Sequence, residues 1–240
     1  MHARLTAGLF AAVLGAAAPR TASAQLVVFG SADAGGQGSS LLLAGLTVSP
    51  GRIGVQPIVG LQAYHLTYRT GPGAATTSND VIAPSLGLKS QNANSAVSLS
   101  GGYAFVSSST RVPALAGPYP IPAAPKNGAF ATAQGDWWGS GDRSGQAIAT
   151  YNFANEFLWS RIRGAHTVGM KTSPLMLGGE AGFFGGGTGT KRWGYFLGPI
   201  ATYKVTPQLK VGGGAGYRAN TSSGSYSSGY AKVDFVWVSR

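Results

Sequence analysis

The chain has 240 residues, with no cysteine, 38 glycines and only 10% charged residues. A typical soluble protein has about 25% charged residues and ~7% glycine, so this composition does not suit a soluble globular surface. The absence of cysteine excludes disulfides, thiolate metal sites and a cysteine nucleophile. Hydrophobic residues at 44% and aromatic residues at 10% argue against a disordered chain.

The first 24 residues predict a secretory signal peptide. Arg4 lies near the start, an apolar run covers 5–18, and Ala22-Ser23-Ala24 supplies the small residues of a cleavage site. We therefore expect 1–24 to be removed and 25–240 to form a single outer-membrane β-barrel domain. Beyond the signal, no segment reaches the roughly 18 consecutive apolar residues of a membrane helix.

The mature chain alternates large apolar residues with small or polar ones, as strands with two different faces do. In one segment, Val97, Leu99, Tyr103 and Phe105 share a face, and small or polar residues form the other. We predict an all-β, antiparallel up-and-down transmembrane β-barrel of about 12 strands, or alternatively 10. The predicted strands cover 26–34, 40–49, 53–69, 80–90, 95–108, 127–138, 145–154, 157–168, 175–185, 191–204, 208–219 and 227–238.

The connections between these strands alternate in length. Short turns are expected at Pro50-Gly51 and at every second connection after it, whereas 70–79, 109–126 and 219–226 are long. Short periplasmic turns and longer outer loops are typical of outer-membrane barrels. The segment 109–126 is rich in proline and is predicted to form a stiff outer loop.

Charged residues inside the predicted strands must point into the barrel, because exposure to lipid is costly. One hypothesis is a polar, net-basic lumen that attracts anions or binds glycan hydroxyls. The alternative is a closed network of ion pairs that plugs a narrow barrel. The lumen candidates are Arg161, Arg163, Glu180, Lys204, Lys210, Arg218, Lys232 and Asp234.

Trp137 and Trp138 are adjacent in a predicted strand, so their side chains should face opposite ways. One indole would then lie in a periplasmic aromatic girdle. The other would lie at the mouth of the lumen, where it could stack on a sugar ring. A role in the girdle alone is the competing interpretation.

Several segments resemble the bacterial cellulose-biosynthesis BcsS family. The similar runs are 158–163, 178–182 and 211–217, together with the opening 29–34 (FGSADA). The resemblance implies an outer-membrane barrel associated with cellulose operons, and it supplies no catalytic residues. The chain departs from the expected pattern because it ends Trp237-Val238-Ser239-Arg240, where outer-membrane barrels usually end on an aromatic residue.

These observations predict an outer-membrane protein of a Gram-negative bacterium, a non-catalytic accessory to cellulose or other exopolysaccharide biosynthesis and secretion. The alternative is a small general outer-membrane pore or structural barrel, and a third hypothesis is a membrane-embedded hydrolase. Only His65 and His166 remain after the signal, and no nucleophile, base and orienting group can be named together. We therefore expect no enzyme, no catalytic residue, no metal and no cofactor.

The expected partners follow from the membrane and from the basic charge. The chain has a formal net charge of +11, but its basic residues are dispersed and form no nucleic-acid recognition motif. We expect outer-membrane lipid and lipopolysaccharide as partners, with exopolysaccharide or secretion-machinery proteins as further candidates, and no nucleic acid.

Overall fold

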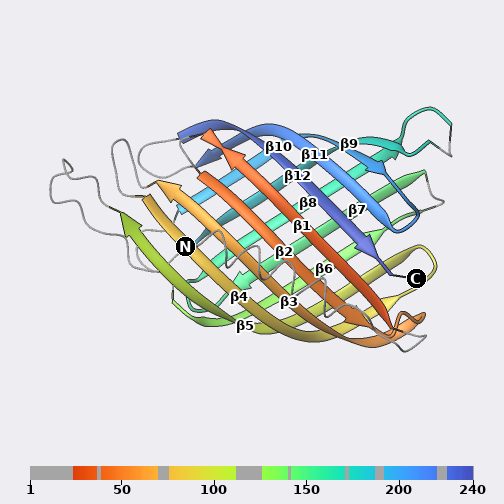
Figure 1. Cartoon of the computed structure of the whole chain (residues 1–240), viewed down its shortest axis with the longest axis horizontal. Coiled ribbons are helices and arrows are strands. Elements are labelled where there is room, and N and C mark those ends of the chain that lie inside the picture. The colour runs from red at the N-terminus through yellow and green to blue at the C-terminus, as the bar shows by residue number, and fades with distance from the viewer. Residues whose placement is uncertain are drawn as a thin grey trace.

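The computed structural model describes residues 24–36, 39–69, 76–111, 126–139, 142–170, 173–186, 192–220 and 226–239. The described strands form one closed barrel in which each strand pairs with its neighbours in sequence, and β1 pairs with β12 to close the sheet. All pairs are antiparallel, and the strands run obliquely across the barrel (Figure 1). The strands are β1 (Gln25–Gly35), β2 (Ser39–Ser49), β3 (Gly54–Arg69), β4 (Thr76–Gln91), β5 (Ser95–Arg111), β6 (Gly128–Trp137), β7 (Arg143–Asn152), β8 (Phe157–Thr167), β9 (Leu175–Gly186), β10 (Arg192–Lys204), β11 (Leu209–Asn220) and β12 (Tyr226–Val238).

The predicted fold and strand number are confirmed, and the alternative of ten strands was wrong. The largest differences in bounds lie on β4, which begins at Thr76 and not at 80, and on β5, which continues to Arg111. Thr76 pairs with Arg111, so the polar ends of β4 and β5 continue the ladder between the two strands. The sequence prediction stopped short of these ends because they lack the alternation of apolar residues. The rest of the predicted Pro-rich loop, 112–125, lies outside the described residues, as does 1–23 of the predicted signal peptide.

The alternation along each strand separates an outward face from an inward face. On β5, Val97 and Leu99 are 63% and 64% exposed, whereas Ala96 and Ala104 of the other face are buried. The same contrast is seen on β10, where Leu197 is exposed and the ring of Phe196 is buried. A soluble barrel would place its apolar residues inside, so this outward apolar face is the arrangement of a barrel that contacts lipid.

Aromatic side chains on the outward face gather in pairs. The rings of Tyr103 and Phe105 have centroids 5.0 Å apart, as do those of Tyr151 and Phe153. Trp193 stacks on Phe183 of the neighbouring strand, also at 5.0 Å. These pairs lie toward the ends of β5, β7, β9 and β10 that meet the predicted outer connections. They form one aromatic girdle of the kind found at membrane interfaces.

Side-chain hydrogen bonds fix the short turns at the other end of the barrel. The Asn92 side-chain oxygen accepts hydrogen bonds from the backbone N–H groups of Asn94 and Ser95. The Thr206 hydroxyl oxygen accepts from the N–H groups of Gln208 and Leu209 in the same manner. Such local bonds satisfy backbone donors where the ladder ends, and they explain why these connections are short.

Among the described residues, no helix is long and apolar enough to cross a membrane.

The inner wall of β9, β10 and β11 is lined by glycine because large rings from neighbouring strands lie over it. A Cβ atom added at Gly182 would fall 2.2 Å from the ring of Phe196. A Cβ atom at Gly216 would fall 2.8 Å from the ring of Tyr230. On the opposite side of the barrel, an inward apolar cluster fills space between β4, β5 and β6; it consists of Val81, Ala83, Ala104 and Phe130.

The outward assignment of β8 and β9 can be tested with charge. Ile162 is 55% exposed on the outward face, and it pairs with the exposed Ala181. An arginine facing lipid near the bilayer midplane costs about 2–4 kcal/mol. We therefore expect Ile162→Arg and Ala181→Arg to impair folding into lipid vesicles, measured by the heat-modifiable gel shift of a folded barrel.

The matched control is Arg161→Gln, which changes the adjacent inward residue and should fold at nearly the normal yield. Equal folding of all three variants would show that the register of these two strands is wrong.

Candidate functional site in the barrel lumen

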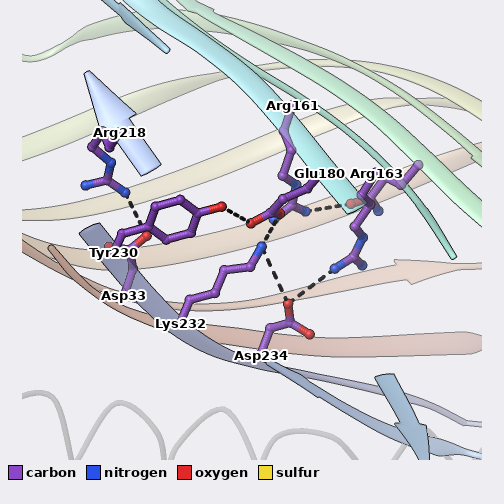
Figure 2. A network of polar contacts seen from close by, with 9 residues as sticks. Asp33, Arg161, Arg163, Glu180, Arg218, Tyr230, Lys232 and Asp234 are labelled. Atoms are coloured by element: carbon purple, nitrogen blue, oxygen red, sulfur yellow. Dashed lines mark hydrogen bonds and ion pairs between the residues drawn. The ribbon is translucent and has the colours of Figure 1, made fainter. Parts of the chain in front are cut away.

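The structure places all eight predicted lumen residues on inward positions of the strands. The strand register explains this, since Arg163 of β8 lies opposite Glu180 of β9, and Glu180 lies opposite Gly198 of β10. Six of them gather in one network with Asp33 and Tyr230, which are inward residues of β1 and β12 (Figure 2). The six are Arg161, Arg163, Glu180, Arg218, Lys232 and Asp234.

A buried ion pair lies at the centre of this network. The Lys232 ammonium group donates to Glu180 Oε2, and the two side chains are 5% and 0% exposed. The Tyr230 hydroxyl donates to the other carboxylate oxygen of Glu180 at 2.9 Å. A buried carboxylate is tolerated only when it is paired and hydrogen-bonded, and both conditions hold here.

Two further ion pairs flank the central one. Arg218 donates to Asp33 Oδ2 at 2.8 Å across the junction that closes the barrel. Arg163 lies 3.3 Å from Asp234 Oδ2, and Lys232 lies 4.0 Å from the same oxygen. The three pairs join β1, β8, β9, β11 and β12, so they hold together strands that are not all neighbours in the sheet.

Arg161 differs from the other cations of the network. Its guanidinium donates to the neutral side-chain amide of Gln146 at 2.6 Å and lies 5.6 Å from the ring centroid of Trp159. None of the ion pairs found among the described residues includes it. Its Nε atom is buried without a hydrogen-bond partner. Gln146 in turn donates to Asp136 at 2.8 Å, so an amide separates Arg161 from that carboxylate.

Lys204 and Lys210 lie outside this network. They are partners in the ladder between β10 and β11, next to the short turn at 205–208. Both are exposed at the barrel end where the short turns lie. Lys89 of β4 also lies toward this end and donates to the side-chain oxygen of Gln25 at 3.0 Å. The arrangement places basic groups around one mouth of the barrel.

The two tryptophans face different surroundings. Trp137 is 40% exposed on the outward face, where its ring lies over Gly145. Trp138 follows the end of β6, and its indole N–H donates to the carbonyl of Ala93 in the adjoining turn at 2.6 Å. Trp137 thus has the position of a girdle residue, and Trp138 ties two turns together. Stacking of either ring on a sugar stays a prediction.

Both histidines lie on the outward face near strand ends. His65 Nδ1 lies 2.8 Å from Asp80 on β4, and His166 lies 3.9 Å from Asp142. Neither belongs to the lumen network.

The site residues that the sequence analysis missed are Asp33, Asp136, Gln146, Trp159 and Tyr230. Alternation puts Trp159 on the same face as Arg161 and Arg163, as the structure confirms, although Trp159 was not among the predicted site residues. The same alternation from Asp234 would have placed Tyr230 inward.

The fold and the charged lumen together are those of an outer-membrane type of β-barrel, and solved structures of that class match the chain. An outer membrane channel from Pseudomonas putida F1 is 10% identical, with a TM-score of 0.58 over 92% of this chain and 97% of that chain. The NanC porin is 9% identical, with a TM-score of 0.50 over 88% of this chain and 98% of that chain. No family model and no curated protein matches the chain. Identities this low show the fold alone.

The expectation that the chain is not an enzyme is withdrawn, because a likeness of fold does not exclude activity. The matching structures also include OmpT, an outer membrane protein of Vibrio cholerae, at 10% identity and a TM-score of 0.41 over 90% of this chain and 98% of that chain. One barrel fold carries different functions, so these neighbours give no ground for excluding activity. The exclusion drawn from the sequence was wrong and is withdrawn.

The buried central pair predicts a strongly non-additive mutant cycle. Lys232→Met leaves the Glu180 carboxylate buried with Tyr230 as its remaining partner, and loss of one partner of such a pair costs about 3–5 kcal/mol. We expect the double variant Lys232→Met/Glu180→Gln to recover much of this loss. Urea unfolding of wild type, Lys232→Met, Glu180→Gln and the double variant in lipid vesicles measures the four free energies of unfolding that the cycle needs. Additive losses would contradict the burial of the pair.

Proposed function

We propose that the chain is a small outer-membrane channel that favours anions. The supporting observation is the charge of the described inward side chains, in which basic groups outnumber acidic ones. A lumen of one predominant sign concentrates ions of the opposite sign and raises their rate of entry. The basic inward residues are Lys89, Arg161, Arg163, Lys204, Lys210, Arg218 and Lys232, and the acidic ones are Asp33, Asp136, Glu180 and Asp234.

The network would act as the constriction of this channel. An open lumen would leave its inward side chains exposed to water. The inward residues Glu180, Lys232 and Tyr230 are nevertheless buried, so side chains fill that part of the lumen. Solutes would pass beside the network, and the lysines at one mouth would set the sign of the ions admitted. The outward apolar face and the aromatic girdle support a location in the outer membrane.

A role beside exopolysaccharide secretion is a second proposal. It rests on the resemblance of 29–34, 158–163, 178–182 and 211–217 to the cellulose-biosynthesis BcsS family. A glycan that crosses or touches the barrel would meet the inward hydroxyls and amides. Lower cellulose or exopolysaccharide output from a deletion strain, restored by the intact gene, would support this role. Unchanged output would count against it.

Ion selectivity tests the first proposal. In a planar bilayer with a salt gradient, we expect the reversal potential of the purified protein to indicate preferred passage of chloride over potassium. Lys204→Gln/Lys210→Gln should reduce that preference, because the pair lies at the mouth of the lumen. The matched control is Arg143→Gln, at an exposed outward position of β7, which should leave the reversal potential unchanged. A cation preference or a barrel without conductance would overturn the proposal.

A further inference from the structure

The cations of the network pair one to one with carboxylates, except for Arg161. Lys232 pairs with Glu180, Arg218 with Asp33 and Arg163 with Asp234. Arg161 is left with a single hydrogen bond, to a neutral amide. We propose that Arg161 is the binding site for a carboxylate attached to a ring. This inference rests on the proposed channel, because it names the class of solute that the constriction takes.

The chemistry of the guanidinium favours a carboxylate. A guanidinium presents parallel N–H donors that match the two oxygens of a carboxylate. Its present acceptor, Gln146 Oε1, is uncharged and makes one bond. The bond to Gln146 has charge on the donor alone and uses one N–H group. A carboxylate brings the opposite charge and accepts from two N–H groups at once, so an incoming carboxylate displaces the amide. After the exchange, the Gln146 amide nitrogen still donates to Asp136, and the Gln146 oxygen gives up its bond from Arg161.

Aromatic faces beside Arg161 supply the preference for a ring. Trp159 precedes Arg161 by two residues on the same inward face and lies under its guanidinium at 5.6 Å from the ring centroid. Phe184 is the ladder partner of Trp159 on β9. Both side chains are half-buried. Relative to the network, they lie toward the barrel end that carries the predicted outer loops. A ring entering from outside would meet these faces first and then present its carboxylate to Arg161.

The remaining charges near Arg161 favour an anion and discourage a cation. Arg163 lies two residues further along the same inward face of β8, and Lys232 lies in the same network (Figure 2). The carboxylates in reach of Arg161 already have partners. Glu180 accepts from Lys232 and Tyr230, Asp234 pairs with Arg163, and Asp136 accepts from the amides of Gln134 and Gln146. The site therefore offers one uncommitted guanidinium among groups whose partners are assigned.

Ligand-observed NMR on the folded protein in detergent tests the site without requiring conductance. The probes are benzoate and glucuronate as two kinds of ring carboxylate, acetate as a carboxylate without a ring, and benzamide as a ring without charge. We expect at least one of the two ring carboxylates to bind more tightly than acetate, and benzamide not to bind. Which of the two binds more tightly identifies the aromatic or the sugar class of solute.

Variants assign the binding to residues. Arg161→Gln should weaken the bound ring carboxylate about tenfold or more, as loss of a charge-assisted pair requires. Trp159→Leu should remove the advantage over acetate while acetate itself still binds. The matched controls are Arg143→Gln and Trp193→Leu, which change the same residue types on the outward face.

The heat-modifiable gel shift confirms that each variant is folded, and Arg161→Lys replaces Arg161→Gln where the latter fails. The lysine keeps the charge but lacks the paired donors, so it should also bind more weakly. Equal affinity of wild type and Arg161 variants, or no binding of either ring carboxylate, would overturn this site. An anion-selective conductance without binding of either ring carboxylate would overturn the proposed binding site at Arg161. The proposed channel function would still stand.

Discussion

The pairing of β1 with β12 is the constraint on which the rest of the structure depends. Closure removes free sheet edges, and it gives every strand one face toward the surroundings and one toward the lumen. Because side chains alternate with a period of two, each residue's face follows from its neighbour's. The outward position of Val233 therefore requires Lys232 and Asp234 to point inward, where charges can find partners.

Inward charges need space as well as partners, and glycine provides that space. The rings of Phe196 and Tyr230 lie over Gly182 and Gly216, and they meet edge to face at 5.9 Å. This packing positions the Tyr230 hydroxyl for its bond to Glu180. The unusual glycine content that excluded a soluble surface in the sequence is thus also a requirement of the buried network. An alanine at Gly216 would displace the ring that orients the carboxylate.

Strand positions and faces could be predicted from the sequence because they are local properties. The alternation of Val97 to Phe105 is visible within one segment, whereas ion pairing is not. Arg163 and Asp234 are separated by 71 residues, and Arg218 and Asp33 by 185. Their meeting depends on the stagger of strands around the closed barrel. Asp33 was missed because its segment shows the alternation weakly, with Phe29 pointing inward to lie over Gly45.

A plug and a pore are not opposed descriptions of this lumen. In each of three ion pairs, the two charges neutralise each other, and the side chains fill space in the lumen. These pairs stabilise the closed sheet because each joins two strands that share no ladder. Arg161 contributes little to that closure, since its hydrogen bond goes to an amide and its Nε has no partner. Burying a cation without a carboxylate is costly, and a fold that needed only closure would gain by an apolar residue there. The cost is understandable if the proposed channel is correct. The paired charges would then shape the passage, and the unpaired Arg161 would recognise the solute.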